Sequence, residues 1–188
     1  MNKTIGFAFC GSFCTFRKAE AALRELADSY NVIPIFSPAS YISDTRFGTA
    51  AFWQEEVSRI CGNAPLHTLQ EVEPFGPKKL LDLLVIAPCT GNTLGKLANG
   101  IADSSVTFAC KAHLRNGRPV VIAISTNDGL SASAENIGRL LNRKHYYFVP
   151  FGQDSPREKP YSLVADLAQL PATVEAALRS EQIQPILL

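Results

Sequence analysis

Residues 88–93, PCTGNT, place a glycine among hydroxyl and amide side chains directly before a helix-like pattern. Such a loop could bind a phosphate, because Gly91 lets the backbone approach closely and the free N–H groups at a helix start attract anions. Thr90 and Thr93 would add hydroxyl donors. The alternative is that Thr90, Asn92 or Thr93 only caps the helix. Spacing alone leaves both open.

A second donor-lined loop, Gly11 and Ser12 with Thr15 shortly after, follows the first apolar run of the chain. Neither loop is a Walker P-loop, and GFAFCG lacks the GxGxxG spacing of a dinucleotide site. We therefore expect no nicotinamide site in this chain. A phosphate bound without those signatures points to flavin mononucleotide (FMN) or a similar ligand.

Several basic side chains could hold a carboxylate, Arg46 above all because its planar fork matches the two oxygens. The other candidates are Lys96, Arg157 and Lys159, and the alternative for each is a solvated surface position. Cys89 could be a nucleophile if a helix dipole lowered its pKa, or a small buried filler. The five cysteines lack CxxC spacing and no histidine has a second ligand at metal spacing, so we expect reduced thiols and no metal site.

The elements that would position these residues alternate along the chain. Apolar runs at 4–9, 32–36, 83–87, 119–124 and 146–149 predict strands, and helical spacing follows in 16–30, 52–60, 94–101, 106–113, 132–143 and 162–179, with an interruption at Pro171. Residues 66–77 are ambiguous and 150–160 are expected to be a loop. Continuous apolarity indicates strands buried on both faces. We predict a single α/β domain over residues 1–188, a three-layer, doubly wound, flavodoxin- or Rossmann-like parallel sheet with helices on both faces.

Ligands of such sheets bind at the carboxyl ends of the strands. The loops after the predicted strands should therefore meet at one edge, which adds Ser37, Ser125, Thr126 and Asn127 to the candidate residues.

Charge and hydropathy exclude other classes of partner. The 18 basic and 17 acidic residues nearly cancel and are scattered, which does not favour nucleic acid or a membrane surface. No long apolar segment or cleavage-like region predicts a spanning helix or a secretory signal. We expect a cytoplasmic protein whose partners are small molecules or proteins.

Residues 88–104, PCTGNTLGKLANGIADS, resemble the Pro-Ala-Ser-Ala-Asn-Thr loop and helix of the flavin-binding family of flavin-dependent cysteine decarboxylases and flavin prenyltransferases. Longer strings are similar to the dipicolinate synthase branch of that family and cover nearly the whole chain. They include TRFG at 45–48, CKAHLRNGRPVVIAISTNDGL, YYFVPFGQD and the terminal QIQPILL.

The resemblance implies one subunit of an oxidoreductase, which acts with the nicotinamide-binding A-subunit of dipicolinate synthase, the NAD(P) being carried by that partner. The pair would oxidise dihydrodipicolinate, or its hydroxy-tetrahydro precursor, to pyridine-2,6-dicarboxylate in the mother cell of a sporulating bacterium. The family also implies a homo-oligomer, such as a trimer or a multiple of it.

The same resemblance implies roles for individual residues. Arg46 and Lys159 would hold the carboxylates of the substrate. FMN would contact two groups of residues. The first, at its phosphate and ribityl chain, is Gly11, Ser12, Ser37, Pro88, Cys89, Thr90, Gly91, Asn92 and Thr93; the second, at the ring or substrate end, is Ser125, Thr126 and Asn127.

Two departures from the family pattern bear on the activity. The helix FWQEEVSRIC lacks the histidine that the decarboxylases carry there, and their Pro-x-Met-Asn motif is replaced by Ser125–Asp128. Decarboxylation is therefore disfavoured. Two alternatives stay open, an independent FMN-dependent decarboxylase or prenyltransferase and a non-catalytic anion- or substrate-binding scaffold subunit.

Overall fold

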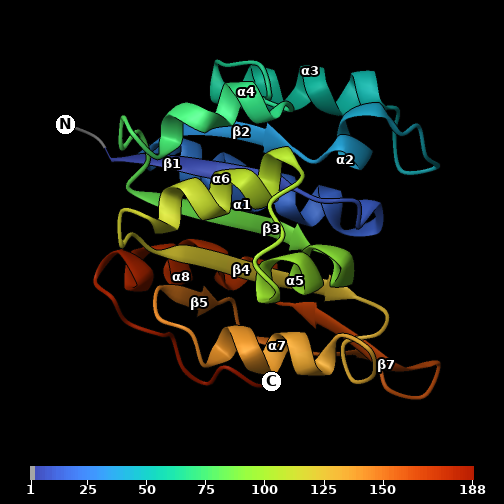
Figure 1. Ribbon diagram of the computed structural model, residues 1–188. Helices are drawn as coiled ribbons and strands as arrows, with labels where there is room; N and C mark the ends of the chain where they lie inside the picture. The colour runs from blue at the N-terminus through green and yellow to red at the C-terminus, as the bar shows by residue number, and fades with distance from the viewer. Residues whose placement is uncertain (1–2) are drawn as a thin grey trace.

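A parallel sheet forms the centre of the protein in the computed structural model, which describes residues 3–188. Its strands are β1 (Thr4–Phe9), β2 (Asn31–Phe36), β3 (Leu83–Cys89), β4 (Val120–Thr126) and β5 (Tyr146–Phe148). They lie in the order β2-β1-β3-β4-β5, with β5 paired to Val120–Ile122 of β4 (Figure 1). Every residue of β3 is buried, as an inner strand with helices on both faces requires. This is the flavodoxin-like strand order, and the predicted fold class is confirmed.

An antiparallel hairpin extends the carboxyl end of this sheet. Strands β6 (Phe151–Ser155) and β7 (Lys159–Ala165) pair with each other, and β7 pairs with β4 at Ser125 and Thr126. The prediction of a loop over 150–160 and of helix from 162 was therefore wrong. Half of the hairpin is exposed, so its sequence lacks the continuous apolarity of a buried strand.

The segment between the hairpin and residue 178 is helical, as predicted, but the helix starts later than predicted. A short 3-10 helix, η3 (Leu167–Gln169), leads into α8 (Leu170–Leu178). Pro171 lies in the first turn of α8, where its missing N–H costs nothing, and so begins the helix rather than interrupting it.

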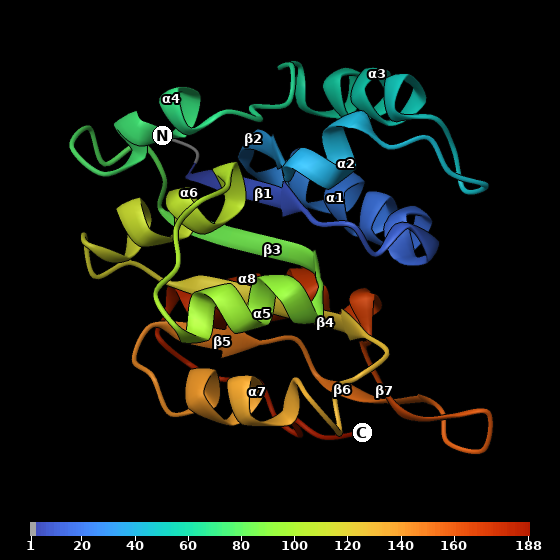
Figure 2. The ribbon, with the colours of Figure 1, turned by 45° about the vertical axis from the view of Figure 1, so that its right-hand side comes forward.

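Helices cover both faces of the sheet (Figures 1 and 2). On one face α1 (Phe16–Ser29) and α8 pack together, with α3 (Ala50–Cys61) beside α1. On the other face lie α5 (Gly91–Ala98) and α6 (Ser105–Leu114), flanked by α7 (Ala134–Leu141). The remaining helical segments are short: η1 (Phe13–Thr15), α2 (Pro38–Ile42), α4 (Leu69–Val72) and η2 (Glu73–Phe75), the last two in the region that the sequence left ambiguous.

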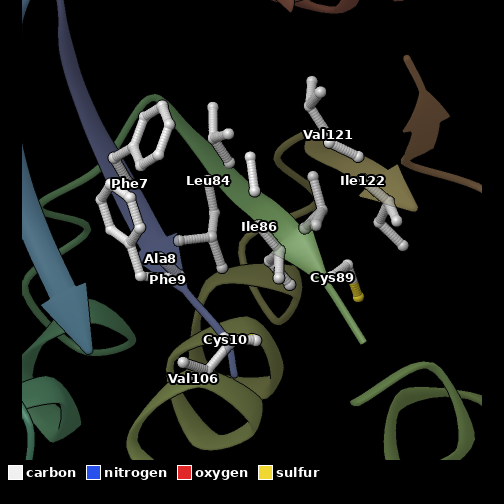
Figure 3. Packing of buried hydrophobic residues seen from close by; sticks show 14 of the residues in the cluster. Phe7, Ala8, Phe9, Cys10, Leu84, Ile86, Cys89, Val106, Val121 and Ile122 are labelled. Carbon is white, nitrogen blue, oxygen red and sulfur yellow. The ribbon is translucent and has the colours of Figure 1, made fainter. Parts of the chain in front are cut away.

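The core is aromatic around β1 and aliphatic around β3 and β4. Figure 3 shows Phe7 and Phe9 beside Leu84 and Ile86, all fully buried. The ring of Phe9 lies 5.3 Å from that of Phe36, a separation at which tilted aromatic pairs attract. This rigid core holds the ends of β1, β3 and β4 in place. No helix among residues 3–188 is long and apolar enough to cross a membrane.

Candidate functional site

A cleft of about 660 Å³ opens at the carboxyl ends of β1 and β4 and beside the β6–β7 hairpin. Its size is typical of small-molecule sites. The lining comes from six parts of the chain: the loop after β1, α1, the turn at Thr45–Phe47, the loop after β3, the end of β4 and the hairpin. The residues are Gly11, Ser12, Phe13, Cys14, Thr15, Lys18, Thr45, Arg46, Phe47, Thr90, Ser125, Thr126, Asn127, Asp154, Lys159, Ser162 and Val164.

Hydroxyl groups from the loop after β1 and from β4 meet in the cleft. The Ser12 and Ser125 Oγ atoms are 2.8 Å apart, although the two strands are separated by β3. Thr15 donates its hydroxyl proton to the backbone oxygen of Ser12 at 2.7 Å. The contact joins the two predicted loops, Gly11–Ser12 and Ser125–Asn127, into one surface.

The backbone of the β1 loop also offers donors to a ligand. Ser12 N–H bonds to Cys10 O at 2.7 Å and Thr15 N–H to Ser12 O at 3.1 Å. None of the hydrogen bonds found within residues 3–188 uses the N–H of Gly11, Phe13 or Cys14. The first turn of α1, which follows, contains no acidic residue. Free N–H groups at a helix start attract anions, so this loop suits a phosphate or a carboxylate.

Cations outnumber carboxylates in the cleft. Lys159 Nζ bonds to Asp154 Oδ2 at 2.9 Å, and this hydrogen bond raises the pKa of Lys159. Arg46 lies in a tight turn closed by two backbone hydrogen bonds of 3.1 Å between Thr45 and Gly48. Within residues 3–188, neither Arg46 nor Lys18 has an ion-pair partner. Two free cations and one paired cation favour a ligand with two negative charges.

The PCTGNT loop caps the N-terminus of α5, which is one of the two roles that the sequence left open. Thr90 Oγ1 accepts a hydrogen bond from Thr93 N at 3.3 Å and so caps α5. Gly91 packs against a polar network, since a Cβ there would lie 2.7 Å from Asp128 Oδ1. A carboxylate already faces the start of α5 at this point. Phosphate binding by this loop therefore receives no support from the geometry, although Thr90 itself lines the cleft.

Six of the predicted site residues do not line the cleft: Ser37, Pro88, Cys89, Gly91, Asn92 and Thr93. Ser37 is buried and caps α2, accepting from Ser40 N at 3.2 Å. Burial raises the pKa of the Cys89 thiol well above its usual value, which makes Cys89 the buried filler rather than a nucleophile. The other eight are brought together: Gly11, Ser12, Arg46, Thr90, Ser125, Thr126, Asn127 and Lys159.

Several residues of the cleft were not predicted from the sequence, among them Lys18, Cys14 and Asp154. Lys18 lies on α1 and carries no motif, so only the folded chain shows that it faces the cleft. Of the other basic candidates, Lys96 is paired with Asp103 at 2.8 Å outside the lining. Arg157 does not line the cleft either. Residues 3–188 contain no group of three His, Cys, Asp or Glu side chains that could hold a metal ion.

The chain is a doubly wound α/β protein with a cleft at the carboxyl ends of its strands, the place where such sheets bind their ligands. The Flavoprotein family model matches residues 1–168, and the chain belongs to this family.

Two relatives resemble the chain over its whole length. It is 44% identical over 188 residues to the dipicolinate synthase B-subunit of Bacillus subtilis (strain 168), covering 100% of this chain and 94% of that protein. The crystal structure of the dipicolinate synthase B-subunit from Bacillus halodurans superposes with a TM-score of 0.91 at 44% identity, covering 100% and 98% of the two chains. The resemblance to the dipicolinate synthase branch is confirmed.

A more distant structure shares the fold. The FMN-dependent cysteine decarboxylase SpaF matches with a TM-score of 0.67 at 20% identity, covering 94% of this chain and 97% of that one.

Proposed function

We propose that the chain is the B-subunit of a dipicolinate synthase and acts with the nicotinamide-binding A-subunit. The pair would oxidise dihydrodipicolinate, or its hydroxy-tetrahydro precursor after loss of water, to pyridine-2,6-dicarboxylate. In the oxidation a hydride passes to the NAD(P)⁺ of the nicotinamide-binding partner and a proton is released, which balances the two hydrogens lost by the ring. The observation that carries the proposal is a cleft with three cations in a chain 44% identical to a dipicolinate synthase B-subunit.

In this proposal the chain positions the substrate. Arg46 and Lys18, which are free of ion pairs within residues 3–188, would each bind a carboxylate of the ring. Lys159 would help to hold one of these two carboxylates, since it is also paired with Asp154. Holding both carboxylates orients the ring carbon that loses the hydride, and such positioning can supply a large part of a rate enhancement. The protein would act in the cytoplasm of the mother cell as a homo-oligomer.

FMN is the proposed second ligand. Two structures that share the fold are of FMN-dependent decarboxylases, SpaF and a UbiX-like enzyme from Escherichia coli O157:H7. The free N–H groups of the β1 loop fit a phosphate, and the cleft is lined by two phenylalanine rings, Phe13 and Phe47. A bound flavin would supply two-electron redox chemistry. The predicted FMN contacts that line the cleft are Gly11, Ser12, Thr90, Ser125, Thr126 and Asn127, and in this proposal they would contact the flavin.

The experiment is a reconstitution of the purified chain with its nicotinamide-binding partner, in which nicotinamide reduction and the absorbance of the pyridine product are followed. We expect Arg46→Ala to abolish product formation and Arg179→Ala, which removes an exposed arginine outside the cleft, to leave it unchanged. Equal rates for both variants would overturn the assignment of the cleft. Full activity of the nicotinamide-binding partner alone would overturn the enzymatic role.

A non-catalytic substrate-binding scaffold is the second candidate. Among residues 3–188 no histidine lines the cleft, and its carboxylate, Asp154, is paired with Lys159. The chain thus offers no ready general base, which favours chemistry on the partner. Two results together would support this candidate. This chain would bind the ligand, and the partner would form dipicolinate when a stoichiometric amount of this chain, with its cleft intact, is present.

An independent decarboxylase is disfavoured. Helix α3 contains no histidine, and His67, which follows it, stacks on Tyr41 with ring centroids 3.6 Å apart, outside the cleft. Turnover of a peptidyl-cysteine by the isolated chain would revive that alternative.

A further inference from the structure

Cations gather at the amino end of the sheet, which lies opposite the cleft and on the left in Figure 1. The loops that precede β3, β4 and β5 span residues 76–82, 115–119 and 142–145. They are neighbours because β4 pairs with both β3 and β5. Although their charges are scattered along the sequence, the fold brings them together. The loops carry six lysines and arginines, which we call the basic edge: Lys78, Lys79, Arg115, Arg118, Arg143 and Lys144.

The basic edge is poor in negative charge. Asp82 is the only carboxylate in its three loops. It pairs with Arg118 at 3.8 Å, and no other cation of the basic edge has an ion-pair partner within residues 3–188. Lys79 has φ +50°, so the chain keeps a cation where glycine is sterically easier. Unpaired like charges in neighbouring loops repel one another, which makes this surface complementary to a negatively charged partner.

An apolar hollow of about 360 Å³ opens beside the basic edge, between the end of α5, the loop after it, α6 and the start of β5. Arg115 and Arg143 of the basic edge line it together with Lys111, and no carboxylate does. Arg143 is held there, because its guanidinium donates to the last two backbone oxygens of α5, at 3.1 and 2.7 Å. Leu114 and Ile101 are part of the apolar lining, and Ile101 is 48% exposed. The hollow is therefore an apolar cavity with a cationic rim.

The hollow and its rim together indicate the kind of partner. Protein interfaces combine an apolar centre with a charged rim, which is the arrangement found here. A nucleic acid would leave the hollow unused, since exposed side chains such as Leu80 and Ile101 are aliphatic and bases stack on aromatic rings. A two-fold contact between copies of this chain would set the cations against themselves. The dipole of α6 favours cations at its C-terminal end, which accounts for Arg115 but not for Lys78.

We propose that the basic edge and its hollow form a docking site for an acidic segment of another protein, one that presents an apolar side chain between carboxylates. The apolar side chain enters the hollow, and the carboxylates pair with Lys111 and Arg115 at its rim. The docking site and the cleft lie at opposite ends of the sheet, so a docked partner leaves the cleft open to its ligand. This site is independent of the reaction proposed for the cleft.

The test uses a rhodamine-labelled peptide with one leucine between two pairs of glutamates, and a second peptide with alanine in place of the leucine. Their affinities for the full chain are measured by fluorescence anisotropy. We expect the leucine peptide to bind about tenfold more tightly, because leucine buries more apolar surface in the hollow. Arg115→Glu should weaken binding of the leucine peptide by about tenfold, because it sets a carboxylate against the glutamates. Arg157→Glu, the same charge change in the exposed turn between β6 and β7, should leave it unchanged.

Two further variants test the rim and the hollow separately. Lys111→Glu repeats the charge change on α6 should Arg115→Glu fail to fold, and Ile101→Ser should lower the preference for the leucine peptide. Equal affinities of the two peptides for the wild-type chain, or no binding of either, would overturn the proposal. Equal or tighter binding of an oligodeoxythymidine would overturn it in favour of a nucleic acid. Dissociation of an oligomer of the chain by Arg115→Glu, measured by light scattering, would make this surface a contact between copies and would also overturn it.

Discussion

Gly91 is the residue whose substitution probes the junction of α5 with the Asp128 loop. A Cβ at this position would lie 2.6 Å from Ser133 Oγ, 2.7 Å from Asp128 Oδ1 and 2.7 Å from Thr126 Oγ1, against 3.4–4 Å for ordinary van der Waals contact. These atoms are hydrogen-bonded to one another and cannot withdraw independently. Overpacking of this kind costs about 1–3 kcal/mol, so we expect Gly91→Ala to lower the free energy of unfolding by about 2 kcal/mol.

The measurement is urea unfolding followed by the fluorescence of Trp53, the single tryptophan, which is 1% exposed. A thermal scan should show a loss of about 4–8 °C in Tm for a chain of this length. Gly95→Ala is the matched control on the same helix, because the nearest atom to its Cβ would be Asn136 Nδ2 at 3.5 Å. Alanine favours a helix interior over glycine, so this control should gain roughly 0.5–1 kcal/mol.

Opposite signs for two Gly→Ala changes on one helix isolate the contact from helix propensity. If Gly91→Ala were as stable as the wild-type chain, or shifted in the same direction as Gly95→Ala, the reasoning that Asp128 packs on α5 would be refuted.

Three further predictions concern other parts of the chain. Cys14 is exposed and lines the cleft, so it should be the fast-reacting thiol of the native chain. Pyridine-2,6-dicarboxylate should slow the labelling of Cys14 by a thiol reagent. An unchanged labelling rate at saturating ligand would contradict binding of the ligand in the cleft. Burial lowers the pKa of His113 to about 4, so the unfolded chain binds a proton at higher pH than the folded one. As the pH falls from 6.5 to about 4, the free energy of unfolding should then decrease by roughly 3 kcal/mol at most. His113→Gln should flatten this pH dependence in urea titrations. The same pH dependence in the variant and the wild-type chain would refute the prediction. Gly48→Ala places a Cβ 2.6 Å from Trp53 Nε1 at a residue with φ +137°. It should destabilise the chain by about 1–3 kcal/mol and weaken dicarboxylate binding, because the turn that carries Arg46 is displaced. Unaltered binding in calorimetry would contradict a role of this turn in the cleft.

The central strands were predictable because their signal is local. A strand buried on both faces must be apolar at nearly every position, so β1, β3 and β4 appear in the sequence as continuous runs. The hairpin of β6 and β7 has no such signal. Its residues are half exposed, and its pairing with β4 joins segments almost forty residues apart, Ser125 with Val164.

The residues of the candidate site also fall into those that a local sequence pattern predicts and those that it does not. Ser12 and Ser125 were predicted to meet because both follow parallel strands, and strand ends share an edge whatever the details of packing. For Thr90 the sequence left two roles open, since a capping hydroxyl and a phosphate-binding hydroxyl have the same local pattern. The Asp128 carboxylate, placed against α5 by the β4–α7 loop, supports the capping role.

The sequence by itself therefore determined the layers of the fold, the edge of the sheet at which the cleft opens, and the family, since all three depend on local apolarity, strand order and strings of adjacent residues. Only the tertiary structure decided which cations share the cleft and which direction each hydroxyl faces. Lys18 and Asp154 come from different elements, and the orientation of Thr126 is determined by a carboxylate across a loop. Charge clustering and hydrogen-bond polarity arise between segments distant along the chain, and no local pattern encodes them.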